Sequence, residues 1–242
     1  MAALVLVRHG QASLRSDDYD RLSDIGLAQS AALGHWLRAT SRTGGRSGGQ
    51  TAGLLARGRM RRHRETADAC LALWFPDGPA PTVEEDAGFD EFDHLDVLGA
   101  HRADFREPGG ISAFLAAADD ANRAFQRQFS AAVERWTSGR HDGDYRESWP
   151  GFQARCVAAM RRVIERTPPS ASAWVFTSGG PIAAICQHAL ELSDAKAMGL
   201  NAVILNTGVT TLRHDRDRVA LSGFNGVAHL DALGDANLFT HR

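Results

Sequence analysis

The sequence contains little cysteine and almost no lysine. Three cysteines, Cys70, Cys156 and Cys186, lie far apart, and none forms a Cys-x-x-Cys pair. This spacing predicts neither a disulfide framework nor a metal site, and it favours free thiols in a reducing cytoplasm. Among the 27 basic residues, Lys196 is the single lysine. We attribute this bias mainly to coding preference, although it also supplies many planar guanidinium groups suited to phosphate.

Long apolar runs are also missing. No stretch is long enough to cross a bilayer, and the amino-terminal MAALVLV is too short for the core of a signal peptide. The net charge of −2 and the pI near 6.5 argue against a general binder of nucleic acid or membrane surfaces. We therefore expect a cytoplasmic protein with no nucleic-acid or membrane partner, and the sequence carries no signal for an oligomeric state.

Short β-prone runs alternate with helical patterns along the chain. The apolar run at 3–7 is typical of a central strand covered on both faces, and Ser23 is suited to cap the helix that follows. Further strands are expected at 51–56, 82–86, 172–177, 201–214 and 218–225, and further helices at 60–75, 110–136, 149–167 and about 181–190. This order predicts a three-layer α/β/α fold whose central sheet is mostly parallel, with an antiparallel edge and a helical cap insertion.

Two segments bear on domain organisation. Residues 40–53 are rich in Gly and Ser, but the alternation of strands and helices continues on both sides, so we expect a long loop inside one domain, 1–242. A turn is expected at Asp215–Asp217. The helical stretch near 100–166 is too long for one crossover. We therefore expect a cap insertion at about 95–150, folded over one end of the sheet.

Arg8 and His9 follow the expected central strand directly, with a glycine after them. Ligands of open α/β sheets bind at the carboxyl ends of the strands. A histidine ring nitrogen there can attack an electrophile, and a guanidinium can hold an anion through paired hydrogen bonds. The pair suits phosphoryl transfer, although an isolated Arg-His-Gly sequence more often marks a structural loop histidine.

The surrounding motifs narrow this choice. LVRHGQAS followed by YDRLSDIGLAQS resembles the histidine phosphatase superfamily, in its phosphoglycerate-mutase-like branch. GRMRRHRETA is similar to the family's Ser-Pro-Leu-x-Arg-x-x-x-Thr-Ala motif and aligns Arg62 with its phosphate-binding arginine, while Gly58 and Arg59 replace Ser-Pro. FDEF matches the motif of the family's acid and places it at Glu91. The later segments WPGFQARC, NTGVTTL and FNGVAHL extend the resemblance over nearly the whole chain.

The resemblance implies a two-step reaction without a metal or a cofactor. His9 would attack phosphorus and form a phosphohistidine, while Arg8 and Arg62 offset the charge on the phosphoryl oxygens. Glu91 would protonate the leaving oxygen and then activate a water molecule. A solvated acidic loop is the alternative interpretation of Glu91. The expected substrate is a small phosphorylated molecule.

One departure from the family is prominent. The family's usual Thr-His-Gly-Gly segment is Thr-Ser-Gly-Gly here, with Ser178 and Gly179 at the expected phosphate-binding turn. Loss of one such donor typically costs about 100- to 1000-fold in rate. His94, three residues after Glu91, or His63, beside Arg62, is a possible substitute. We prefer His94, and a structural role is an alternative for both.

Other functions are less compatible with the motifs. The ERHYG-type segment of true mutases is missing. The acid-phosphatase branch extends its first motif as Arg-His-Gly-x-Arg-x-Pro, whereas here Gln11, Ala12 and Ser13 follow Gly10. A serine hydrolase would need Gly-x-Ser-x-Gly around Ser178, but Phe176 occupies the first glycine position. A protein that binds phosphorylated ligands with weak or no turnover is the remaining alternative to a phosphatase.

Overall fold

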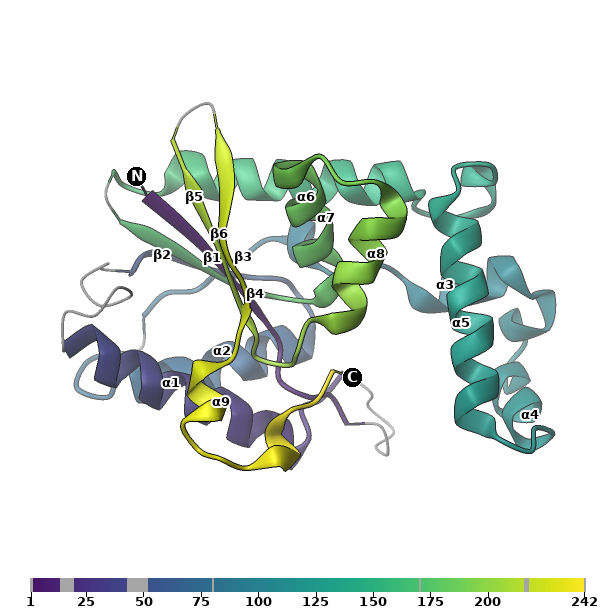
Figure 1. Cartoon of the computed structure of the whole chain (residues 1–242), viewed down its shortest axis with the longest axis horizontal. Helices are drawn as coiled ribbons and strands as arrows, with labels where there is room; N and C mark the ends of the chain where they lie inside the picture. The colour runs from purple at the N-terminus through teal and green to yellow at the C-terminus, as the bar shows by residue number, and fades with distance from the viewer. Residues whose placement is uncertain are drawn as a thin grey trace.

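A mixed sheet runs through the centre of the molecule (Figure 1). The computed structural model describes residues 2–13, 20–42, 52–79, 81–169, 171–215 and 218–241. Within these ranges the sheet has six strands in the order β3-β2-β4-β1-β5-β6. Their bounds are β1 (Ala2–Arg8), β2 (Ala52–Arg57), β3 (Glu84–Glu85), β4 (Ser172–Thr177), β5 (Val209–His214) and β6 (Val219–Gly226).

Strands β3, β2, β4 and β1 are parallel neighbours, whereas β5 and β6 continue the sheet in antiparallel fashion. In the centre, Leu4 of β1 lies opposite Ala173 of β4 on one side and Leu212 of β5 on the other. This topology confirms the predicted α/β fold with a mostly parallel sheet and an antiparallel edge. It also places the carboxyl ends of β1 and β4 side by side.

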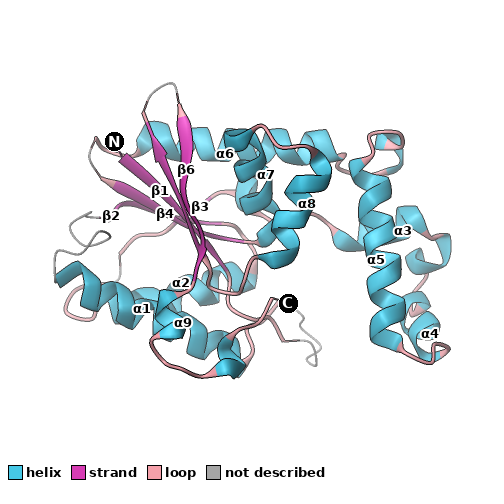
Figure 2. Cartoon of the chain, in the orientation of Figure 1, coloured by secondary structure: helices cyan, strands magenta, loops and turns pink. Residues whose placement is uncertain are grey.

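Helices cover both faces of the sheet (Figure 2). One layer contains α1 (Asp24–Arg42), α2 (Arg61–Trp74) and α9 (Ala228–Asp231), and the other contains α6 (Trp149–Arg166), α7 (Gly179–Leu190) and α8 (Asp194–Val203). Because successive strand residues face opposite sides, Val5 packs in the cluster of α1 and α2, whereas Leu6 packs in the cluster of α6 and α7. The predicted three layers follow from this alternation. Ser23 caps α1 as expected, because its Oγ accepts a hydrogen bond from the Gly26 amide at 3.1 Å.

A helical lobe stands at one end of the sheet (Figure 1). It consists of α3 (His94–His101), α4 (Gly110–Ala116) and α5 (Ala121–Thr137), with short 3-10 turns at Ala87–Phe89, Ala103–Arg106 and Asp142–Asp144. Trp136 of the lobe packs against Trp149 of α6, with 5.1 Å between ring centroids. The helical lobe and the layer containing α6 therefore share one hydrophobic cluster.

The prediction of one helix over 110–136 is wrong. The chain leaves the helical conformation after Ala116, and Asp120 starts α5 by accepting a hydrogen bond from the Arg123 amide at 2.9 Å. The apolar periodicity continues across the break, because α4 and α5 both contribute side chains to the same cluster. Periodicity alone therefore concealed a helix start that the capping residue marks.

The prediction of a strand over 201–214 is also wrong in its first half. Residues up to Val203 belong to α8, and β5 begins only at Val209. A short apolar run such as AVIL does not distinguish a helix from a strand by periodicity. Between the two elements Thr207 has a φ of 56°, and its amide donates to the Arg8 carbonyl at 3.0 Å.

The other predicted elements are present with shifted ends, and β3 is shorter than expected. Two predicted segments lie largely outside the described residues. These are the loop at 40–53, of which 43–51 is not described, and the turn at Asp215–Asp217, of which 216–217 is not described. None of the helices in the described ranges combines the length and the apolar composition needed to cross a bilayer. One domain over 1–242 stays a prediction.

Candidate active site

His9 lies at the carboxyl end of β1 and is 5% exposed. Its amide donates to the Thr177 carbonyl at 2.8 Å, and the Asn206 side-chain amide donates to the His9 carbonyl at 3.0 Å. The segments after β4 and before β5 therefore hold the backbone of His9 from two sides. Asn206 had no motif to mark it in the sequence.

The His9 ring has a defined orientation. Its Nδ1 lies 2.7 Å from the Gly10 carbonyl oxygen. A carbonyl oxygen only accepts hydrogen bonds, so Nδ1 carries the proton, and Nε2 of a neutral ring keeps its lone pair. His9 is thus held in the tautomer that presents Nε2 as a nucleophile.

The surroundings keep this ring neutral. Burial lowers the pKa of His9 well below its usual value, and the nearby charges of Arg62 and Arg8 lower that pKa further. A protonated ring would have no lone pair at Nε2. The same environment that removes water therefore keeps His9 in its reactive form.

Arg62, the second residue of α2, is 7% exposed and acts electrostatically on several groups. Its charge lowers the pKa of His9, His63, Glu91 and His94, which places Arg62 among all four. Its Nη1 donates to Asp20 Oδ1 at 2.7 Å, whereas its buried Nε has no hydrogen-bond partner among the described residues. One donor of Arg62 is therefore left without an acceptor among the described residues.

Arg8 reaches across the sheet end to the last part of the chain. Its Nη1 donates to the Ile204 carbonyl, and its Nη2 donates to the His241 carbonyl at 3.3 Å. These carbonyls orient the guanidinium without neutralising its charge. Arg8 consequently lowers the pKa of both His9 and Glu91.

Glu91 precedes the helical lobe, and burial raises the pKa of its carboxyl group, although Arg62 opposes this rise. Its Oε2 accepts a hydrogen bond from the Gly180 amide at 3.2 Å. A Cβ at position 180 would lie 2.0 Å from Glu91 Oε1, so the second glycine of TSGG is required for the approach of this carboxyl group. The contact joins Glu91 to the start of α7.

The backbone before Glu91 is fixed independently of its side chain. Thr177 Oγ1 donates to the Phe89 carbonyl at 2.6 Å, and Arg155 Nη1 donates to the Asp90 carbonyl at 3.1 Å. These bonds attach the acidic segment to β4 and α6. Glu91 is therefore a positioned, partly buried carboxyl group.

Arg8, His9, Arg62 and Glu91 thus converge at one end of the sheet. In another part of the chain, residues 116–226 match the family model described as histidine phosphatase superfamily (branch 1). The chain is therefore similar to this family from the end of α4 to the end of β6. A search of curated proteins gave no match.

Solved structures of a phosphoglycerate mutase and of phosphatases share the fold over nearly the whole chain. A phosphoglycerate mutase from Bacillus anthracis aligns with a TM-score of 0.63 at 14% identity and covers 97% of each chain. A mycobacterial glucosyl-3-phosphoglycerate phosphatase aligns with a TM-score of 0.61 at 22% identity, covering 93% of this chain and 99% of its own. A phosphoserine phosphatase mutant from Entamoeba histolytica, in complex with phosphoserine, aligns with a TM-score of 0.56 at 16% identity, covering 95% and 100%.

Ser178 contacts His63. Ser178 Oγ and His63 Nε2 are 2.7 Å apart, and both residues are fully buried. The His63 ring also lies 5.8 Å from the His9 ring between centroids. The histidine beside Ser178 therefore comes from α2, not from the segment after Glu91.

His94 and Gly179, two further predicted site residues, are the first residues of α3 and α7. His94 starts α3 and is partly buried, and its pKa is lowered by burial and by Arg62, while Asp93 opposes that shift. Gly179 is buried as the first residue of α7. The structure thus brings His94 within the electrostatic reach of Arg62, whereas His63 makes the direct contact with Ser178.

A serine and a histidine in hydrogen-bond contact raise the question of a serine nucleophile in this superfamily fold. In such enzymes a third group orients the histidine through its other ring nitrogen. Nδ1 of His63 is buried and has no hydrogen-bond partner within the described ranges. The pair therefore lacks the arrangement of a serine hydrolase, in agreement with the bulky Phe176.

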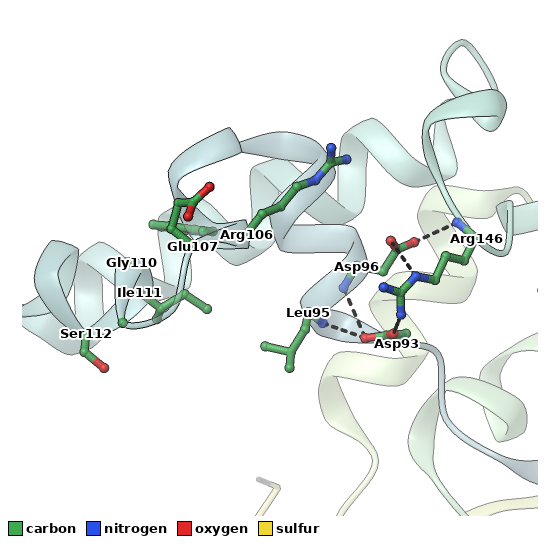
Figure 3. A pocket seen from close by; sticks show the side chains of 11 residues that line it. Asp93, Leu95, Asp96, Arg106, Glu107, Gly110, Ile111, Ser112 and Arg146 are labelled. Atoms are coloured by element: carbon green, nitrogen blue, oxygen red, sulfur yellow. Dashed lines mark hydrogen bonds and ion pairs between the residues drawn. The ribbon is translucent and has the colours of Figure 1, made fainter.

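A cavity of 520 Å³ opens in the helical lobe (Figure 3). The first residue that lines it, Asp93, follows Glu91 by two positions. Asp93 and Asp96 lie on one side of the cavity, beside Arg146. The backbone amide of Arg146 donates to Asp96 Oδ2 at 2.8 Å, and Arg146 Nη1 lies 3.4 Å from Asp93 Oδ2. Arg106 and Glu107 line the opposite part. The lobe therefore surrounds a charged cavity next to the segment that carries Glu91. No cluster of three His, Cys, Asp or Glu side chains in the described ranges is arranged to hold a metal ion.

Proposed function

We propose that this protein is a metal-independent phosphomonoester hydrolase that forms a phosphohistidine on His9. The match of residues 116–226 to the histidine phosphatase superfamily model supports an enzyme of the phosphatase type. The observation that carries the proposal is the bond from His9 Nδ1 to the Gly10 carbonyl, which leaves Nε2 free to attack phosphorus.

In the first step, His9 Nε2 forms a bond to phosphorus while the bond from phosphorus to the leaving oxygen breaks. Arg8 and Arg62 offset the charge of the phosphoryl oxygens as the transition state forms. Glu91, kept protonated by burial, gives its proton to the leaving oxygen. The products of this step are an alcohol, a phosphohistidine and the Glu91 carboxylate.

In the second step, the Glu91 carboxylate takes a proton from water, and the water oxygen attacks phosphorus. The bond between phosphorus and Nε2 breaks, so that inorganic phosphate leaves and His9 becomes neutral again. Glu91 ends protonated, which restores the starting state.

Ser178 and Gly179 are proposed to bind phosphoryl oxygens at the start of α7. This end of a helix presents unpaired amides and a positive partial charge, both of which favour an anion. The proposal agrees with the position of Gly180, whose amide already contacts the Glu91 carboxyl group.

The substrate is proposed to be a small phosphorylated molecule. The Entamoeba histolytica phosphoserine phosphatase has been solved with phosphoserine and with 3-phosphoglyceric acid. Three buried free thiols, Cys70, Cys156 and Cys186, fit the proposal that the enzyme works in the reducing cytoplasm.

The test is to trap the intermediate with a radiolabelled phosphomonoester and an alkaline quench. The wild-type protein should carry label on His9, and His9→Ala should carry none and lose more than about 1000-fold in kcat/KM. His35→Ala, on the exposed face of α1, is the matched control and should label normally. A wild-type protein that binds phosphate tightly but never becomes labelled would contradict the hydrolase and support the alternative of a phospho-ligand-binding protein.

A further inference from the structure

Two departures from the usual motifs, at positions 58 and 178, both lie next to the His63 ring. Gly58 stands before α2, and His63 is the third residue of that helix. A Cβ built on Gly58 would lie 2.3 Å from Nδ1 and 2.8 Å from Cε1 of His63. Any residue larger than glycine at 58 would therefore collide with the His63 ring. The same ring contacts Ser178 at its other nitrogen.

The His63 ring is an unusual feature for a purely structural residue. It is fully buried, yet its Nδ1 has no hydrogen-bond partner among the described residues. Leaving a buried polar atom unsatisfied costs about 1–3 kcal/mol, and such exceptions call for an explanation. An apolar side chain would fill the space without this cost. The retained contact is the one between Nε2 and Ser178.

The location of the pair is suited to act on a group attached to His9. The rings of His63 and His9 are 5.8 Å apart, and Ser178 precedes the proposed phosphate-binding turn. No backbone amide of α7 is bound by the Ser178 hydroxyl as a helix cap, so this hydroxyl is not engaged at the helix start.

We infer that His63 is the positioning residue that replaces the missing second histidine by orienting Ser178 toward the transferring phosphoryl group. His63 Nε2–H donates to Ser178 Oγ, and the Ser178 hydroxyl proton is thereby directed to a phosphoryl oxygen. This inference rests on the proposed phosphatase function. Ser178 touches the substrate, and His63 acts through it.

The protonation state of His63 agrees with this assignment. Burial, followed by the charges of Arg62 and Arg57, lowers its pKa well below the usual value, so the ring is neutral. A neutral ring has one proton, and a proton on Nε2 makes the hydrogen bond to Ser178 Oγ. Nδ1 then remains as an unpaired acceptor beside Gly58.

The first experiment compares His63→Ala, Ser178→Ala and the double variant in kcat, KM and vanadate affinity. Each single variant should lose about 100-fold in kcat, KM should change less than about threefold, and the double variant should lose no more than the worse single variant. Vanadate affinity should fall in parallel with kcat, because vanadate mimics the phosphoryl group in transit. Affinity for inorganic phosphate should change little.

The second experiment tests the coupling to Gly58 and the rescue. Gly58→Ala should lower kcat much more in the wild type than in His63→Ala, where the new Cβ meets only Asp90 Oδ1, at 2.9 Å, and no longer the ring. In His63→Ala/Ser178→His, an imidazole returns to position 178, and kcat should recover to within about tenfold of the wild type. Thermal melts identify any variant that fails to fold, and His35→Ala is the control for replacing a histidine.

The outcomes separate this inference from the proposed function. A wild-type protein that never labels His9 overturns both. A wild-type protein that labels His9 while His63→Ala folds and keeps kcat within about threefold overturns the role of His63 alone. A loss confined to His94→Ala would also overturn it and would return the role to His94.

Discussion

At the scale of single residues, the proposed roles of His9 and Glu91 require opposite shifts of pKa in one environment. The nucleophile His9 must be unprotonated at Nε2, whereas the general acid Glu91 must carry a proton. Burial disfavours the charged form of either group, so it lowers the pKa of His9 and raises that of Glu91. The environment therefore shifts both groups toward their neutral forms, which is the combination that the proposed first step requires.

Glu91→Gln should separate substrates by their leaving group. Glutamine cannot donate a proton, so kcat/KM for an alkyl phosphate should fall about 100- to 10,000-fold. With 4-nitrophenyl phosphate, whose phenolate leaves without protonation, the loss should be at least about tenfold smaller. Steady-state kinetics on the two substrates measure the difference.

The pH profile provides a second measurement on the same variant. Because the pKa of Glu91 is raised, wild-type kcat/KM for the alkyl phosphate should fall as pH rises through that pKa. This descending limb should be absent in Glu91→Gln. Equal losses on both substrates, with the limb retained, would contradict the role of Glu91 as general acid.

Residues that act through space were harder to predict than residues in motifs. Arg8 and His9 follow a strand, and Glu91 lies in a short motif, so each could be singled out. His94 was preferred over His63 because it is close to Glu91 in sequence. The contact that matters joins residues 115 positions apart, and only the packing of α2 against β4 creates it.

At the scale of elements, the start of α2 combines a structural and a chemical role. Its N-cap, Met60, has no side-chain hydrogen bond, and Asp20 instead accepts from the Arg61 amide at 2.6 Å and from Arg62 at 2.7 Å. A carboxylate at a helix start also interacts favourably with the helix dipole. Asp20 therefore anchors both the helix and the arginine that it presents.

Asp20→Ala should lower the free energy of unfolding by about 1–2 kcal/mol, because the first turn of α2 loses its acceptor. It should also raise KM, because Arg62 loses the partner that orients it. Asp20→Asn, which keeps an acceptor for the Arg61 amide, should lose less than half as much stability. Urea unfolding and steady-state kinetics measure the two effects.

Asp77→Ala is the matched control, since Asp77 is 86% exposed and pairs only with Arg38 at the surface. It should change the free energy of unfolding by less than about 1 kcal/mol. If Asp20→Ala behaves like this control, Asp20 does not anchor α2.

Strands were predictable from the sequence where both of their faces are buried, and helices were predictable where their capping residues are clear. The central strand and its parallel neighbours are continuous apolar runs, and they were identified with nearly correct ends. The errors at α4, α5 and α8 arose where the same apolar spacing fits two structures. In those places a capping carboxylate or a left-handed residue decides the outcome, as at Asp120 and Thr207.

At the scale of the whole molecule, buried neutral histidines make stability depend on pH. His229 is 3% exposed, contacts Thr207 Oγ1 at 2.9 Å, and has its pKa lowered from 6.5 to about 4 by burial. In the unfolded chain the same ring would be protonated below its usual pKa. The stability that a lowered histidine pKa supports is therefore present above that usual pKa and is lost as pH falls.

Acidification should thus destabilise the fold, and His229 should account for a measurable part. Between about pH 7.5 and about pH 5, the wild type should lose about 2 kcal/mol more than His229→Asn. His9 and His63 add to the loss in both proteins, because burial lowers their pKa values as well. Urea unfolding at the two pH values measures the effect.

His35→Asn, at an exposed position of α1, should keep the wild-type pH dependence. Parallel pH dependences for His229→Asn and the wild type would show that His229 does not stay neutral in the fold.

The geometry around Gly58 also links two positions of the sequence. A side chain at 58 and the imidazole at 63 would occupy the same space, so we expect relatives that carry histidine at 63 to carry glycine at 58.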